Sequence, residues 1–136
     1  MLQYINEDEY KELLGTDSVP DNFTQYLNDA SSYINYRTRA RIDTDDIHEN
    51  VKYATALIIQ EISKAETLKE EVGNLKSQNI EGWSESYATP EEIEETLESK
   101  KEDIIKRYLW NVIGADGNPL LYCGVWLWIK SFLYIQ

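Results

Sequence analysis

Apolar side chains recur every three or four residues in four stretches of the chain, the spacing that lines one face of an α-helix. This pattern predicts helices over residues 7–14, 22–38 and 47–71, and a fourth that opens at Pro90 and is ended by Gly114. We therefore expect an all-α fold, a small bundle of about four helices. The stripes of the last three helices run through Phe23, Tyr26, Leu27, Ala30, Tyr33 and Ile34, then Ile47, Val51, Ala54, Ile58, Ile62, Ala65 and Leu68, then Ile93, Leu97, Ile104 and Tyr108.

Polar residues mark where three of these helices begin. Asn6 with Glu9, and Asp46 with Glu49, both match a capping box, in which two side chains satisfy free backbone N–H groups. Thr89 stands before a proline at the first helical position, another common helix start. The third helix has the longest apolar stripe, so we expect it to be the central and most buried one.

The helical spacing of apolar residues is interrupted in the middle of the chain, over residues 73–88, which are rich in Ser, Asn and Gln. This segment is interpreted as a short polar β-hairpin or a mobile loop that needs a neighbour for stability. Trp83 and Tyr87 lie within it. Large aromatic rings gain little from exposure, so these two either fold back on the core or contact a partner. We take both as candidate assembly contacts.

The end of the chain, residues 120–136, is apolar and contains no acidic residue and one basic residue, Lys130. It is short for a membrane span and carries that charge inside, so we prefer burial in the domain or against another subunit to membrane insertion. We therefore divide the chain into a helical domain, 1–119, and an apolar assembly tail, 120–136. The candidate assembly contacts in the tail are Leu120, Leu121, Tyr122, Trp126 and Trp128.

The amino-acid composition excludes several classes of function. With 25 acidic residues against 13 basic ones in 136, the net charge is −12, which argues against general nucleic-acid binding. One cysteine and one histidine exclude an internal disulfide and a Cys- or His-rich metal centre. The first residues lack the features of a secretory signal, which indicates a cytosolic protein. We expect no catalytic residue, no metal and no cofactor.

One basic cluster stands out, formed by Arg37, Arg39 and Arg41 at the end of the second predicted helix. It is a candidate contact for a partner or for a DNA backbone. The alternative is that these arginines compensate the helix dipole and form local ion pairs.

Four segments follow one another in a distinctive order. They are DEYKELLG with a following Phe-x-x-Tyr-Leu helix that ends in Tyr and Arg, then IHENVKYATALIIQEI, LKSQNIEGWSESYA and IIKRYLWNVIGADGNPLLYCGV. Together they resemble one known family, the head-tail connector (head completion or adaptor) proteins of tailed bacteriophages. The resemblance covers roughly residues 4–125 and departs from the family at Cys123, where an arginine is usual, and in the eleven residues after Val125.

This resemblance implies a structural role in the virion. Members of the family are helical subunits that form a homo-oligomeric ring below the portal protein, extend the DNA channel and provide a docking site for the next completion, stopper or tail protein. DNA passes through such a ring without specific binding. The location implied is the head-tail junction of the virion, with assembly in the host cytoplasm.

Two other classes of function fit the composition. A small acidic regulatory or DNA-mimic protein would bind a basic host enzyme in a one-to-one complex. A tail-anchored membrane protein would insert residues 120–136 into a bilayer.

Overall fold

The structure, a computed structural model, describes residues 3–77 and 89–121 and contains four α-helices. The predicted all-α bundle is confirmed. Within the described ranges, the β-type pairing is a single antiparallel bridge between Ile113 and Pro119. The helices are α1 (Glu7–Leu14), α2 (Phe23–Arg37), α3 (Glu49–Ser77) and α4 (Pro90–Leu109).

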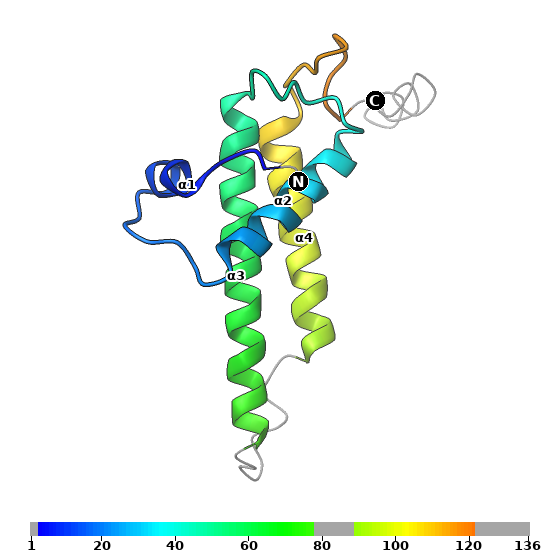
Figure 1. Cartoon of the computed structure of the whole chain (residues 1–136). Coiled ribbons are helices and arrows are strands. Elements are labelled where there is room, and N and C mark those ends of the chain that lie inside the picture. The colour runs from blue at the N-terminus through cyan, green and yellow to red at the C-terminus, as the bar shows by residue number, and fades with distance from the viewer. Residues whose placement is uncertain (1–2, 78–88, 122–136) are drawn as a thin grey trace, which may run out of the picture.

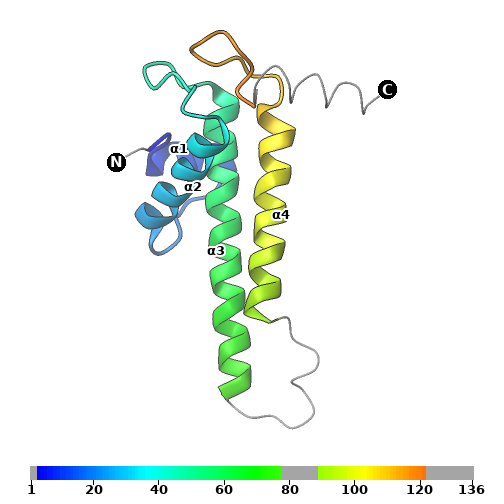
Figure 2. The same ribbon diagram turned by 90° about the vertical axis from the view of Figure 1, so that its right-hand side faces the viewer.

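Two long helices, α3 and α4, form an antiparallel pair that runs the length of the molecule (Figures 1 and 2). The shorter α1 and α2 both pack against α3, near the end where α3 begins. The loop between α2 and α3 and the segment that follows α4 meet at that same end (Figure 1).

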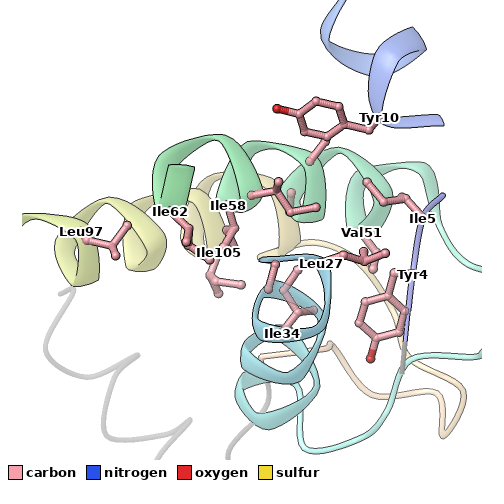
Figure 3. Close-up of a cluster of buried hydrophobic side chains, with 14 of the residues drawn as sticks. Tyr4, Ile5, Tyr10, Leu27, Ile34, Val51, Ile58, Ile62, Leu97 and Ile105 are labelled. Carbon is pink, nitrogen blue, oxygen red and sulfur yellow. The ribbon is translucent and has the colours of Figure 1, made fainter. Parts of the chain in front are cut away.

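The core is organised around α3, whose apolar side chains are buried on more than one side. Ile58 and Ile59 are neighbours in sequence and point in different directions around the helix, and both are fully buried. Figure 3 shows apolar side chains from α2, such as Ile34, and from α4, such as Ile105, gathered around α3. The expected central position of this helix is therefore confirmed.

Two of the three predicted helix caps, those at Asn6 and Thr89, form as expected. The Asn6 side chain accepts a hydrogen bond from the N–H of Glu9 at 2.8 Å, and the Glu9 carboxylate accepts the Asn6 N–H at 3.2 Å. Gly15 ends α1 in the left-handed conformation, with φ 64°. At α4 the Thr89 hydroxyl oxygen accepts the N–H of Glu92 at 3.2 Å.

The predicted start of the third helix is wrong by two residues. α3 begins at Glu49 instead of residue 47, and His48 takes the place of Asp46 before the first turn. The His48 carbonyl accepts the Val51 N–H at 3.0 Å, and its ring Nδ1 accepts the Asn50 N–H at 3.0 Å. An imidazole nitrogen can accept a free N–H group as a carboxylate does. The prediction considered only the acidic pair Asp46 and Glu49, and it therefore placed the helix start too early.

The same helix continues further than predicted. α3 runs to Ser77, so residues 73–77 are helical and not part of the expected hairpin or loop. Gly73 lies inside the helix, where glycine costs about 1 kcal/mol relative to alanine but does not force an end. The remaining residues of the expected loop, 78–88, lie outside the described part of the chain.

The buried face of α4 differs from the predicted one by one residue along its C-terminal half. Ile105 and Leu109 are fully buried, whereas Ile104 and Tyr108 are only half-buried. The helix also ends at Leu109 and not at Gly114. The four apolar residues form two adjacent rows on α4, and the apolar pattern alone does not choose between them.

This corrected face can be tested with a matched pair of truncations. We expect Ile105→Ala to lower the free energy of unfolding by about 2–5 kcal/mol, because it leaves a cavity beside α3. Ile104→Ala should cost clearly less, because its side chain is partly in solvent. Chemical denaturation of the two variants measures both values, and equal losses would contradict the assignment.

Candidate assembly surface

Arg37, at the end of α2, is bound to Glu102 on α4. Its Nε donates to Glu102 Oε2 at 3.1 Å, and its Nη2 pairs with Oε1, so the contact is bidentate. The Tyr33 hydroxyl also donates to Glu102 Oε2, at 3.0 Å. These contacts join α2 to α4 over a separation of 65 residues in sequence, so Arg37 has a structural partner inside the chain.

The Tyr33 ring sits between two charged residues of α4. Besides the bond to Glu102, the Lys101 ammonium lies 4.5 Å from the ring centroid, within cation–π range. Burial, with the hydrogen bond to the Glu102 carboxylate, raises the pKa of Tyr33 from 10.0 to about 12. The ring therefore stays protonated well above the pH at which a free tyrosine ionises.

Arg41 connects the α2–α3 loop to the segment after α4. Its Nε pairs with the Asp116 carboxylate at 3.2 Å, and its Nη1 donates to the carbonyls of Pro119 and Leu120 at 3.3 and 3.4 Å. The Arg41 carbonyl accepts the Ala115 N–H at 2.8 Å. This arginine is therefore also bound within the fold.

The backbone between these two arginines turns sharply. Arg39 and Ala40 both have left-handed φ values, 55° and 59°, which cost non-glycine residues about 1–2 kcal/mol each. The turn is held by the Ala40 N–H, which donates to the Asn35 carbonyl at 2.9 Å, and by the Thr38 hydroxyl, which donates to the Ile34 carbonyl at 2.8 Å. As a result Arg39 is exposed, and within residues 3–77 and 89–121 no ion pair involves it.

Large apolar side chains are exposed at this end of the molecule. Tyr36 is 80% exposed, Trp110 66% and Ile113 60%. Tyr36 lies in the last turn of α2 and Arg39 just after it, whereas Trp110 and Ile113 follow the end of α4; we call these four exposed residues the end surface.

A pocket opens beside the end surface. It has a volume of about 430 Å³, and Val51, Val112 and Leu120 contribute buried apolar side chains to its wall. Its other residues combine exposed acidic and apolar groups. The full lining is Ile42, Asp43, Asp46, Ile47, His48, Glu49, Val51, Val112, Ile113, Gly114, Ala115 and Leu120.

The predicted tail contacts are only partly in the described residues. Leu120 is 1% exposed and belongs to the core of its own chain, where its N–H donates to the Val112 carbonyl at 2.8 Å. Leu121 is half-buried against the same core. The other candidate contacts lie outside the described residues: Trp83, Tyr87, Tyr122, Trp126 and Trp128.

Comparisons with known protein families, with curated proteins and with solved structures find no significant match to this chain. In the described part of the chain, no helix is both long enough and apolar enough to cross a membrane. In the same residues, no group of three or more His, Cys, Asp or Glu side chains converges as metal ligands would.

The different roles of the arginines predict different effects on stability. Arg37→Ala should lower the free energy of unfolding by about 1 kcal/mol, because it leaves the half-buried Glu102 carboxylate without its cation. Arg39→Ala should change it by less than about 0.5 kcal/mol. Urea denaturation of both variants is the measurement, and a larger loss for Arg39→Ala would contradict these assignments.

The environment of Tyr33 predicts a loss of stability in alkali. Because its pKa is about 12 in the folded chain and about 10 when unfolded, its contribution is complete below pH 10 and falls as the pH rises toward 12. Tyr33→Phe should make this decline shallower. Unfolding measured across this pH range tests the prediction, and an equally steep decline in Tyr33→Phe would contradict it.

Proposed function

We propose that this chain is a structural protein of a tailed bacteriophage, a head-tail connector subunit without catalytic activity. It forms a homo-oligomeric ring below the portal protein, extends the DNA channel and provides a docking site for the next completion, stopper or tail protein. Its place is the head-tail junction of the virion, and it assembles there from the host cytoplasm.

The observation that carries this proposal is the end surface. Exposed aromatic and aliphatic side chains, together with an exposed arginine that forms no ion pair within the described ranges, are the composition typical of protein contact sites. This surface also lies where the chain continues from Leu121 into the apolar residues 122–136. Exposed apolar groups and an apolar tail at one end of a helix bundle suit a subunit that is completed by neighbours.

Charge supports the part of the proposal that concerns DNA. A net charge of −12 repels a phosphate backbone, so a channel made of such subunits lets DNA slide. Two of the three clustered arginines are bound to acidic partners within the fold, Arg37 to Glu102 and Arg41 to Asp116. The cluster therefore offers one exposed cation to a partner, which favours a protein contact over a DNA contact.

The order of the sequence segments gives the proposal its specificity. The four stretches that resemble the connector family include nearly all of α1 and the first half of the long helix α3. A ring uses heterologous interfaces, so each subunit needs two different complementary surfaces, and the end surface supplies one of them.

The proposal is tested by capturing the tagged chain from its phage-producing cells and identifying the partners by mass spectrometry. We expect portal and capsid proteins, with Trp110→Ser reducing their recovery about tenfold because it removes a large exposed contact. Leu68→Ser is the matched control, since Leu68 is also exposed but lies in the second half of α3, about 28 Å along the helix from its start at Glu49.

Two results would contradict the proposal. Recovery of a basic host enzyme in a one-to-one complex would instead favour an acidic regulatory or DNA-mimic protein. Recovery from the membrane fraction alone would favour a tail-anchored protein.

A further inference from the structure

We propose that the pocket between the α2–α3 loop and the segment after α4 is the docking site for the C-terminal residues 122–136 of the same chain. We call it the acidic pocket; its lining residues are given above with its volume of about 430 Å³. The inference concerns the single subunit and does not rest on the proposed function.

The first argument is chemical complementarity. The walls of the acidic pocket contain aliphatic side chains, among them Ile47 and Ile113, and its rim carries the carboxylates of Asp43, Asp46 and Glu49. Residues 122–136 are rich in large apolar side chains, contain no acidic residue, and have a single charged side chain, the cation of Lys130. An apolar segment with one positive charge matches an apolar pocket with a negative rim.

Two of the rim carboxylates form no ion pair with other described residues. The Lys52 ammonium is attracted by Asp46 and Glu49, but it is bound to the Glu9 carboxylate at 2.6 Å. Asp46 and Glu49 are exposed, and among the described residues neither takes part in an ion pair. They are therefore available to a cation that enters the pocket.

The second argument is where the chain leaves the described structure. Leu120 forms part of the pocket wall, so residues 122–136 begin at the edge of the pocket. Lys130 follows Leu121 by nine residues, which span up to about 30 Å when extended. This length is enough for the chain to turn back and place Lys130 at the rim of the same pocket.

The choice of the chain's own tail over that of a second copy follows from tethering. A tethered segment is present at an effective concentration in the millimolar range, which a second molecule does not reach in dilute solution. The intramolecular contact therefore forms first.

The test places a spin label near Lys130 and follows the amide signals of the pocket by NMR. The protein is the full chain with Cys123→Ser and Ser131→Cys, labelled at the new thiol, which is then the only one. We expect the label to reduce the signals of Ile47 and Ile113 by more than about half and to leave that of Val72 unchanged, because Val72 lies about 34 Å along α3 from Glu49. Undiminished pocket signals would overturn the proposal.

A mixed sample separates the two possible donors of the tail. Isotope-labelled chain without the spin label is combined with spin-labelled chain that carries no isotope. We expect no reduction of the pocket signals in this mixture, because the tail docks on its own molecule. A reduction there equal to that in the doubly labelled protein would show docking by a second copy and would overturn the proposal.

Charge reversal tests the role of the rim. Asp46→Lys should lower the docking equilibrium constant about fivefold, Lys130→Glu should do the same, and the double variant should recover most of the loss. Asp45→Lys is the matched control, because Asp45 is an exposed neighbour with the same charge that does not line this pocket. Equal effects of Asp45→Lys and Asp46→Lys would contradict a specific contact at the rim.

Discussion

The fold depends on the burial of α3 by partners on different sides. Ala54, Ile58 and Ile59 cover a wide arc of this helix and are all fully buried, which no single neighbouring helix can achieve. α4 packs along its length, and α1 and α2 pack near its beginning. The short α1 and the polar α2 have little stability of their own, so their positions follow from the apolar surface that α3 offers.

Packing on α3 brings the ends of α2 and α4 close together, and polar contacts then fix their arrangement. Arg37 binds Glu102 on α4, and Arg41 binds Asp116 and the carbonyls beyond it. Gly114 is required at this junction, since a Cβ there would lie 2.9 Å from both the Cβ and the carbonyl oxygen of Arg41. The close approach that results sets the end surface and the acidic pocket side by side.

Local signals predicted much of this fold and long-range contacts account for the rest. The capping box at Asn6 and the apolar stripes depend on residues that are close together in the sequence. The all-α fold and its four helices could therefore be predicted. The buried row of α4 and the pairing of Arg37 with Glu102 depend on residues far apart in the chain. The exposure of Trp110 likewise depends on where α4 ends, which the pattern placed too late.

The end surface, where we propose that neighbouring proteins bind, and the acidic pocket, where we propose that residues 122–136 dock, share Ile113. The central claim is that the chain belongs to the head-tail junction. Electron cryomicroscopy of the purified phage tests it most directly. The account predicts a ring directly below the portal into which α3 and α4 fit as an antiparallel pair. A map of that junction in which every ring is accounted for by other proteins would contradict it.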